Sequence, residues 1–269
     1  MNPTDPLDTL TRLEGFLADF PSAAVAFSGG VDSTLVLAVA HRAVTGPVLA
    51  ITGISPSVSP TEAAEARTTA GRIGAELLFA ETHEMDNPAY VANTGDRCYH
   101  CKTELYEVCR DIARERDLAV VLDGSNADDT GDHRPGMVAA AEKGVVSPLL
   151  ECGVGKAEIR GLARHLGLPT WDKPALACLS SRLPVGTEVT VARLRAVDTV
   201  EQHLRSLGFA QVRARHLGPT VRIEVEPHLI DDLRRHADDG TLAELTTAAG
   251  FTTYEIDPRG YRQGSLNLL

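Results

Sequence analysis

The sequence is poor in aromatic residues and in long apolar runs. Aromatic side chains make up 4% of its 269 residues, and a single Trp is present. No run of about eighteen apolar residues occurs, which excludes an ordinary membrane-spanning helix. Residues 1–8 contain two prolines and two aspartates and lack the apolar stretch of a signal peptide. We therefore expect a cytoplasmic protein that does not bind a membrane.

Positive charge is also in deficit. The chain has 26 Lys and Arg against 37 Asp and Glu, for a formal net charge of −11. Non-specific RNA binding depends on neutralising phosphates, so a strongly acidic chain is a poor default candidate for it. We expect a small-molecule substrate and no nucleic-acid partner.

Two common nucleotide-binding motifs are missing as well. The G-x-x-x-x-G-K-[ST] loop, which brings a lysine to a γ-phosphate, does not occur. The dinucleotide pattern G-x-G-x-x-G is also absent. In their place, residues 24–33 read AVAFSGGVDS, a strand-like apolar run followed by two glycines and the start of a helix-like stretch.

This segment has the properties of a phosphate cradle. Gly29 and Gly30 leave backbone N–H groups uncovered at a strand-to-helix turn. The helix N-terminus adds about half a positive charge. Ser28 and Ser33 add hydroxyl donors, and Asp32 can hold Mg²⁺ against a phosphate.

Strand-like and helix-like segments alternate over the first two thirds of the chain. After the strand that ends at Phe27, we expect further strands at 47–54, 76–80, 118–123 and 145–149, with helices at 60–73, 102–116 and 156–166. This alternation favours an α/β fold with a parallel sheet covered by helices on both faces. Ligands of such sheets bind beyond the carboxyl ends of the strands. The segments at 28–33, 52–55 and 124–129 all end or follow strands.

The pattern changes near Thr187. A helix at 190–207 precedes a strand pair at 210–214 and 221–225 that turns at Gly218-Pro219, and a last strand is expected at 251–256. We therefore expect two domains, residues 1–186 and a small α+β domain at 187–269 that serves substrate binding or oligomerisation.

Five cysteines need an explanation, because disulfides are rare in the cytoplasm. Cys98 and Cys101 form a C-x-x-C pair, which fits half of a zinc site, a redox pair or half of an iron–sulfur site. Cys178 lies between Lys173 and Arg182. Three thiolates without a fourth partner suit a 4Fe-4S cluster with one open iron. Cys109 has the setting of a core residue, and Cys152 is ambiguous.

Several motifs together resemble known enzymes. The SGGVDS loop resembles the pyrophosphate-binding loop of the ATP-pyrophosphatase (PP-loop) superfamily, which implies cleavage of ATP between its α- and β-phosphates. The motifs RCYHCKTELY, GSNADD, PALACLSSR and RGYRQGS follow in order at residues 97–106, 124–129, 174–182 and 259–265. This series resembles the LarE family of ATP-dependent sulfur transferases over residues 10–265.

The resemblance implies a function in assembly of the nickel-pincer nucleotide cofactor of lactate racemase. LarE enzymes convert the carboxylates of pyridinium-3,5-biscarboxylic acid mononucleotide into thiocarboxylates. In one variant of the family, a cysteine at the position of Cys178 gives up its own sulfur. In the other, three cysteines hold a 4Fe-4S cluster that delivers a hydrosulfide, and the presence of Cys98, Cys101 and Cys178 resembles this variant. This variant also implies a sulfide donor that reloads the cluster. The family also implies a homo-oligomer, a trimer or a hexamer.

The same resemblance, read with the chemistry of the side chains, assigns candidate site residues. Cys178, Cys98, Cys101 and Asp32 are expected to be catalytic, and the three cysteines are the expected cluster ligands. ATP and Mg²⁺ are expected to contact Phe27, Ser28, Gly29, Gly30, Asp32, Ser33, Thr52, Gly53, Asn126 and Asp129. The anionic substrate is expected to contact Tyr99, Arg182, Arg213, Arg215, Glu201, Glu224, Asp231, Asp232 and Arg259. Guanidinium groups bind phosphate and carboxylate in a bidentate manner, and Arg213 and Arg215 share one face of a strand.

Other functions fit part of the sequence. A tRNA thiolation enzyme would share the loop and the three cysteines, but the charge of −11 argues against it. An amide-forming ligase of the NAD or GMP synthetase kind would use ammonia and gives no reason for the cysteines. A non-catalytic nucleotide-binding regulator would not turn ATP over to AMP.

Overall fold

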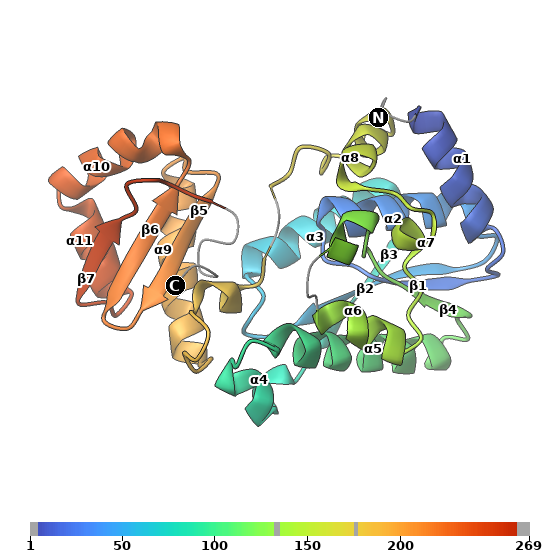
Figure 1. The fold of residues 1–269 in the computed structure, drawn as a ribbon, viewed down its shortest axis with the longest axis horizontal. Coiled ribbons are helices and arrows are strands. Elements are labelled where there is room, and N and C mark those ends of the chain that lie inside the picture. Colours follow the sequence, from blue (N-terminus) through green and yellow to red (C-terminus); the bar gives the residue numbers. More distant parts are fainter. Residues whose placement is uncertain (1–4, 132–134, 175–176, 263–269) are drawn as a thin grey trace. The chain divides into compact units, whose positions relative to one another are not determined.

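A buried strand, β1 (Ala23–Ala26), made of small apolar residues, lies inside the first sheet of the molecule (Figure 1). The structure is a computed structural model, and it describes residues 5–131, 135–174 and 177–262. Four parallel strands pair in the order β3-β2-β1-β4, with β2 at Val48–Ile54, β3 at Glu76–Glu81 and β4 at Val120–Leu122. The register aligns Ala23 with both Val48 and Val120.

Two apolar layers cover this sheet. One layer joins the sheet to α1 (Pro6–Leu17), α2 (Val31–Ala43), α3 (Pro60–Ile73), α7 (Pro148–Glu151) and α8 (Lys156–His165). The other joins it to α5 (Arg97–Glu115) and α6 (Pro135–Glu142). Helices thus cover both faces, which confirms the expected α/β class with a parallel sheet.

The order of the strands fixes where a ligand can bind. The chain runs outward from β1 through β2 to β3, and then returns by α5 to place β4 on the opposite side of β1. The loops that follow β1 and β4 therefore diverge from neighbouring strands, which makes the crevice where open α/β sheets bind ligands. The expected phosphate loop at 28–33 and the segment 124–129, which contains the expected nucleotide residues Asn126 and Asp129, both begin at this point.

The fifth expected strand, at 145–149, is wrong. The structure has one parallel bridge between Leu122 and Val146, and α7 begins at Pro148. Proline has no N–H to donate to a sheet and is well suited to the first turn of a helix, so Pro148 ends the pairing. The helix expected at 102–116 begins earlier, at Arg97, and therefore includes Cys98 and Cys101.

A second sheet lies in the C-terminal region. The antiparallel pair β5 (Val212–Leu217) and β6 (Thr220–Val225) turns at Gly218-Pro219, where Gly218 has φ 69°. Strand β7 (Thr253–Ile256) pairs parallel to β6, which completes the order β5-β6-β7. The helices here are α9 (Val191–Ser206), α10 (Ile230–Asp238) and α11 (Thr241–Ala248), and the short helix α4 (Pro88–Ala92) spans the first junction between the two regions.

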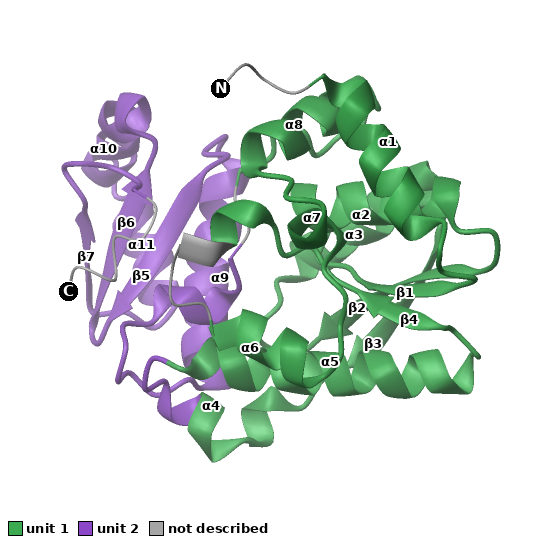
Figure 2. Cartoon of the chain, turned by 45° about the vertical axis from the view of Figure 1, so that its right-hand side comes forward, with its two compact units in different colours: residues 1–90, 96–176 green, residues 91–95, 177–269 purple. Residues whose placement is uncertain are grey.

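Contacts divide the chain into two compact units (Figure 2). Unit 1 comprises residues 1–90 and 96–176, and unit 2 comprises residues 91–95 and 177–269. Residues 91–95 belong to unit 2 because the backbone amides of Gly186 and Val189 donate to the carbonyls of Asn93 and Val91. The expected functional division after residue 186 stays a prediction. Four 3-10 turns complete the described elements, at Glu84–Asp86, Ala127–Gly131, Leu179–Arg182 and Pro227–Leu229.

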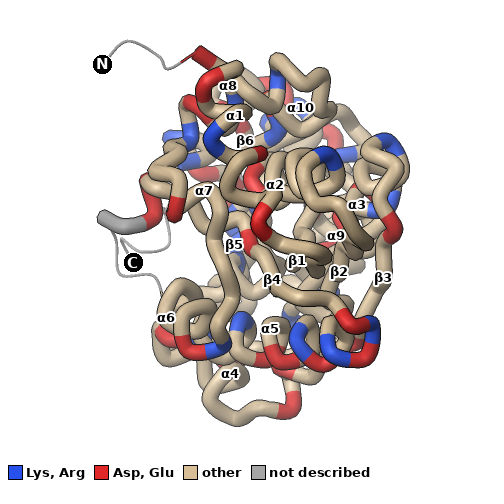
Figure 3. The backbone as a smooth tube through the Cα atoms, turned by 90° about the vertical axis from the view of Figure 1, so that its right-hand side faces the viewer, with Lys and Arg blue, Asp and Glu red and all other residues tan. Residues whose placement is uncertain are grey.

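Acidic and basic residues are interspersed along the chain (Figure 3). In α5, for example, Asp111 lies between Arg110 and Arg114 in the sequence. Across the part of the chain that the structure describes, none of the helices has the length and apolar character needed to cross a membrane.

Candidate functional site

The loop between β1 and α2 gathers hydroxyls around the first turn of a helix. The Ser28 and Ser33 hydroxyl oxygens lie 3.1 Å apart, and the Ser28 amide donates to the Ser33 hydroxyl at 3.2 Å. The Gly30 amide donates weakly to the Ser28 hydroxyl, at 3.3 Å. Gly30 caps α2 without a side chain, so amides and hydroxyls are grouped where the helix dipole is positive.

Two close approaches require glycine around this loop. Gly29 has φ 70°, and a Cβ on it would lie 3.1 Å from the Cα of Ala66 in α3. Gly124 follows β4, and a Cβ there would lie 2.8 Å from the backbone nitrogen of Ser33. The loop is therefore held tightly between α3 and the end of β4. This cradle fits the polyphosphate of a nucleotide.

Two lysines reach the loop from elsewhere in unit 1, and the sequence analysis missed both. The Lys156 ammonium at the start of α8 contacts the two carboxylate oxygens of Asp32 at 2.5 and 2.7 Å. The Lys173 ammonium donates to the carbonyl of Gly29 at 3.1 Å and pairs with Glu65 at 2.8 Å. One signal in the sequence could have indicated them. The loop itself contains no lysine, so the charge of a bound polyphosphate needs cations from other segments.

The other predicted nucleotide residues lie at the same edge of the sheet. The Thr52 hydroxyl donates to the carbonyl of Phe27 at 2.6 Å, which ties the end of β2 to the end of β1. A Cβ on Gly53 would lie 3.0 Å from Leu105. The Asn126 amide donates to the carboxylate of Asp129 at 3.0 Å, so this pair shapes the turn after β4. The structure thus brings these loops together, while their contacts with ATP and Mg²⁺ stay predictions.

Asp123 organises the end of β4. Its buried carboxylate accepts hydrogen bonds from the hydroxyls of Tyr106 at 2.6 Å, Ser125 at 2.8 Å and Ser147 at 2.7 Å, and from the Ser125 amide at 3.1 Å. Burial, together with the charge of Asp123, raises the pKa of Tyr106 far above its usual value. Tyr106 therefore stays a donor and pins α5 to the sheet.

Helix α5 carries two of the predicted cluster ligands. Cys98 is exposed and Cys101 is half-buried, and their i, i+3 spacing places both on one side of the helix. Tyr99, between them, donates through its hydroxyl to Glu142 at 2.6 Å, and this hydrogen bond raises its pKa. Cys109 is buried, and burial raises the pKa of its thiol to about 12, as expected of a core residue.

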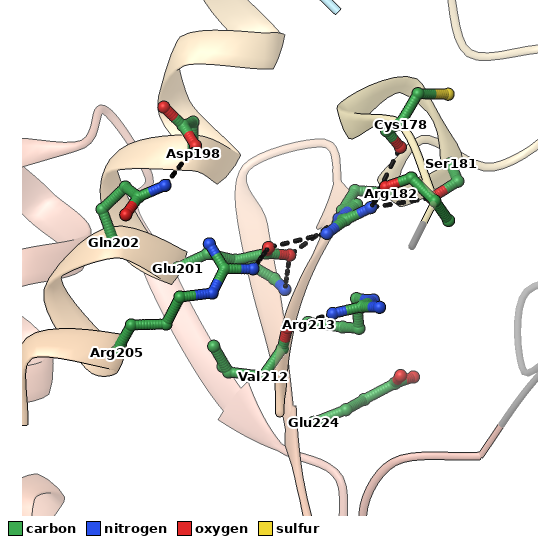
Figure 4. Close-up of polar contacts among 12 residues, drawn as sticks. Cys178, Ser181, Arg182, Asp198, Glu201, Gln202, Arg205, Val212, Arg213 and Glu224 are labelled. Carbon is green, nitrogen blue, oxygen red and sulfur yellow. Dashed lines mark hydrogen bonds and ion pairs between the residues drawn. The ribbon is translucent and has the colours of Figure 1, made fainter. Parts of the chain in front are cut away.

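Unit 2 contains a buried ion pair beside Cys178 (Figure 4). Arg182 is 1% exposed and Glu201 is fully buried, and the guanidinium donates to both carboxylate oxygens at 2.7 Å. The same guanidinium donates to the carbonyls of Ala177 and Cys178 and to the Ser181 hydroxyl. Arg182 therefore fixes the backbone around Cys178 to α9. Glu201 also accepts from Arg205 at 2.8 Å, a partner that the sequence analysis did not identify.

A second pair lies on the adjoining strands. Arg215 donates to one oxygen of Glu224 at 3.0 and 2.9 Å and to the carbonyl of Ser181 at 3.1 Å. Arg213 stands directly opposite Glu224 across β5 and β6, and its guanidinium lies over the ring of Tyr261 at 5.2 Å. The structure thus groups five predicted substrate residues in unit 2, namely Arg182, Arg213, Arg215, Glu201 and Glu224.

Positive charge exceeds negative charge in this group, which is buried except for the partly exposed Arg205. Four guanidinium groups (Arg182, Arg205, Arg213 and Arg215) surround two carboxylates (Glu201 and Glu224). Burial alone would raise the pKa of Glu201, but hydrogen bonding and charge from Arg182, with the charge of Arg213, lower it. Burial, and then the charge of Arg182, lower the pKa of Arg213. Such a group favours an anionic ligand.

Three predicted substrate residues of unit 2 stand apart from this group, and a fourth, Tyr99, belongs to unit 1. Asp231, which is exposed, and Asp232, which is half-buried, lie on α10 and pair with Arg234 and Arg235 of the same helix. Arg259 is exposed, and its guanidinium lies 3.6 Å from Asp257. Residues 175–176 and 263–265, which belong to two of the motifs, lie outside the described residues.

No group of three or more His, Cys, Asp or Glu side chains is arranged around a potential metal position within the described residues of either unit. The two thiols of α5 are accessible as ligands, and Cys178 belongs to the other unit. The three-cysteine cluster therefore stays a prediction.

Comparison with known proteins supports this description. The family model for asparagine synthase matches residues 17–131, which include the loop and β1 to β4. The uncharacterized protein slr1717 of Synechocystis is 43% identical over 258 residues, 96% of both chains. The uncharacterized protein MJ0830 of Methanocaldococcus jannaschii is 28% identical over 76% of this chain and 78% of its own.

A third relative carries a functional name. The pyridinium-3,5-bisthiocarboxylic acid mononucleotide synthase of Lactiplantibacillus plantarum is 35% identical over 252 residues, 93% of this chain and 91% of the synthase. A match of this extent covers most of both units. The chain belongs to the LarE family, the family of this synthase.

Proposed function

We propose that this protein is an ATP-dependent sulfur transferase that adenylates the carboxylates of pyridinium-3,5-biscarboxylic acid mononucleotide and converts them to thiocarboxylates. The observation that carries the proposal is the phosphate loop at the β1–β4 divergence in a chain 35% identical to a bisthiocarboxylate synthase. The alternative functions lack a specific observation of this kind.

The first step is activation of a carboxylate. A carboxylate oxygen of the substrate attacks the α-phosphorus of ATP, the bond to the β-phosphate oxygen breaks, and pyrophosphate leaves. The amide of Gly30 and the hydroxyls of Ser28 and Ser33 stabilise the charge of the leaving group, with the helix dipole of α2 behind them. Asp32 would hold Mg²⁺, and Lys156 lies close enough to replace its contact with Asp32 by one with phosphate.

The proposed substrate carries two carboxylates and a phosphate on a cationic pyridinium, and these anionic groups need cations at their binding site. The buried group of unit 2 has four guanidinium groups against two carboxylates, and neutralising this excess favours an anion there. Arg182 and Arg215 are braced by their carboxylate partners and by backbone carbonyls. We assign Arg213 and Arg215 to substrate anions and Arg182 to orientation of the Cys178 segment.

The second step is attack of sulfur on the acyl-adenylate, with departure of AMP. Sulfur is the suitable nucleophile because thiolates and hydrosulfide are strongly nucleophilic near neutral pH. Cys98, Cys101 and Cys178 would hold a 4Fe-4S cluster, which supplies a hydrosulfide at its open iron when bound. Without a cluster, the Cys178 thiolate itself would attack the carbonyl and expel AMP to form a thioester. Loss of the Cα proton of Cys178 and cleavage of its Cβ–S bond would then release the thiocarboxylate and leave dehydroalanine.

The test is anaerobic purification followed by iron and acid-labile sulfide analysis, then incubation with ATP, Mg²⁺ and the biscarboxylate. Mass spectrometry of substrate and protein follows both products. We expect AMP, pyrophosphate and thiocarboxylate, with Cys98→Ala abolishing multiple turnover and Cys109→Ala, a core control, retaining it. Loss of one sulfur mass from Cys178 would instead show the sacrificial route. Absence of AMP formation with the biscarboxylate would refute the proposed function.

A further inference from the structure

Lys173 contacts the phosphate loop at the residue where the loop is most constrained. Its side chain is 19% exposed, and its ammonium donates to the carbonyl of Gly29 at 3.1 Å. Gly29 is the loop residue with φ 70°, and it packs against Ala66. Glu65, the neighbour of Ala66 in α3, pairs with the same ammonium at 2.8 Å. One cation therefore joins α3 to the loop.

The contact fixes the direction of a phosphate-binding amide. In a planar trans peptide, the carbonyl oxygen and the N–H point to opposite sides. The carbonyl of Gly29 and the N–H of Gly30 belong to the same peptide plane, so holding the carbonyl at Lys173 turns the N–H toward the Ser28 and Ser33 hydroxyls. Glycine has little intrinsic preference for one backbone conformation. The contact with Lys173 therefore favours one orientation of the Gly29–Gly30 peptide.

The backbone of Lys173 is itself anchored. The Arg160 guanidinium, from α8, donates to the carbonyls of Trp171 at 2.7 Å and Lys173 at 2.9 Å. The amide of Lys173 donates to the carbonyl of Thr170 at 3.1 Å. Residues 170–173 thus form a fixed turn in unit 1, and Cys178 follows five positions after Lys173 in the sequence.

We propose that Lys173 is a positioning residue that couples nucleotide occupancy of the phosphate loop to the turn at residues 170–173, which precedes Cys178 in the sequence. This inference rests on the proposed function for its nucleotide. Phosphate that accepts from the Gly30 N–H polarises the peptide and strengthens the Gly29 carbonyl as an acceptor for Lys173. Coupling between two sites is reciprocal, so the turn at 170–173 and the nucleotide stabilise each other by the same factor.

The test is hydrogen exchange followed by mass spectrometry, with and without Mg²⁺ and α,β-methylene ATP, which cannot be cleaved at the reacting bond. In the wild-type protein, we expect nucleotide to slow exchange in residues 28–34 and, by about tenfold, in residues 170–173. In Lys173→Met, exchange in 28–34 should still slow at saturating nucleotide, while the response of 170–173 is lost. Nucleotide affinity should weaken by about the same factor of ten.

Two further variants complete the test. Lys143→Met removes a lysine that pairs with Glu107 on the α5 side of the sheet, and it should leave both responses unchanged. Lys173→Arg keeps a cationic donor and should restore most of the response at 170–173, which also serves if Lys173→Met fails to fold. Slowing at 28–34 in the wild type without any at 170–173 overturns the inference. So does an intact response in folded Lys173→Met. No slowing at 28–34 in the wild type would instead refute nucleotide binding and hence the proposed function.

Discussion

The phosphate loop of unit 1 presents amides and hydroxyls, and its charged neighbours Asp32 and Lys156 are both partly exposed. In unit 2, Arg182 and Glu201 are almost completely removed from solvent. The amides and hydroxyls of the phosphate loop are neutral, so the loop loses little folding free energy when no ligand is bound. Buried charges, in contrast, destabilise the fold strongly when one partner of a pair is removed. We therefore expect substitutions in unit 1 to change activity before stability, and substitutions in unit 2 to change stability first.

The largest effect should come from Glu201→Ala. It leaves Arg182 buried without a carboxylate, which costs about 3–5 kcal/mol of unfolding free energy. Urea unfolding, with hydrogen exchange in β5 and β6 to locate the loss in unit 2, measures it. Glu188→Ala, at an exposed side chain of the same unit, should stay within about 0.5 kcal/mol. Equal losses in the two variants would contradict the role assigned to burial.

Asp32→Asn should separate activity from stability in unit 1. The carboxylate is partly exposed, so unfolding should change by less than about 1 kcal/mol. Loss of the proposed Mg²⁺ ligand should lower the rate of pyrophosphate release by about 100-fold. Asp111→Asn, which breaks an exposed pair with Arg114 on α5, is the matched control. A rate unchanged by Asp32→Asn would remove Asp32 from the site.

Gly124→Ala tests the close approach of β4 to the loop. The new Cβ would lie 2.8 Å from the Ser33 nitrogen, so the loop must shift, and overpacking of this kind costs about 1–3 kcal/mol. ATP affinity, measured by calorimetry, should fall with it. Gly71→Ala in α3 has open space around its Cβ and should instead stabilise by up to about 1 kcal/mol. Unaltered ATP binding in Gly124→Ala would show that the contact is dispensable.

A smaller effect should follow pH in unit 2. Burial, and then the charge of Arg193, lower the pKa of His216, whose ring packs against Phe251 at 5.2 Å. The unfolded chain therefore binds a proton before the folded chain does, and stability falls as pH drops below the usual histidine pKa of about 6.5. Comparing unfolding at pH 7.5 and 5.5, we expect His216→Leu to lose less stability on acidification than the wild type. An equal loss of stability in the two proteins would exclude His216 as a cause of the pH dependence.

The smallest effect should come from Asp231→Asn and Asp232→Asn. Asp231 is exposed and Asp232 is half-buried, and both pair only with arginines of their own helix among the contacts of the described residues. Stability should change by less than about 0.5 kcal/mol. A large loss of substrate affinity in steady-state kinetics would restore them to the substrate site that the sequence predicted.

Sequence alone predicted the parts of the site that are local in the chain. Ser28 to Ser33 occupies a single turn, so its residue types define a cradle before any packing is known. Lys156 and Lys173 escaped prediction because they lie 124 and 144 positions from the loop residues that they contact. The alternation of side chains in a strand predicted that Arg213 and Arg215 lie on one face. Their position relative to Glu224 could be identified only from the register of β5 and β6. The error at Pro148 has a local cause. The apolar residues at 145–149 predicted a strand, but Pro148 begins a helix within that run.

The carboxylate of Asp123 has a consequence for how the sequence can vary. Four donor groups from three residues contact its two oxygens, and Asp123 is the acceptor in every one of these hydrogen bonds. An asparagine at this position would direct an NH₂ donor at hydroxyls that themselves donate to Asp123. Those hydroxyls would have to rotate to accept a hydrogen bond from the NH₂ group. The position therefore tolerates change only in concert with Tyr106, Ser125 and Ser147. These four residues form one hydrogen-bonded network that ties the helix bearing Cys98 and Cys101 to the end of β4, beside the nucleotide loop.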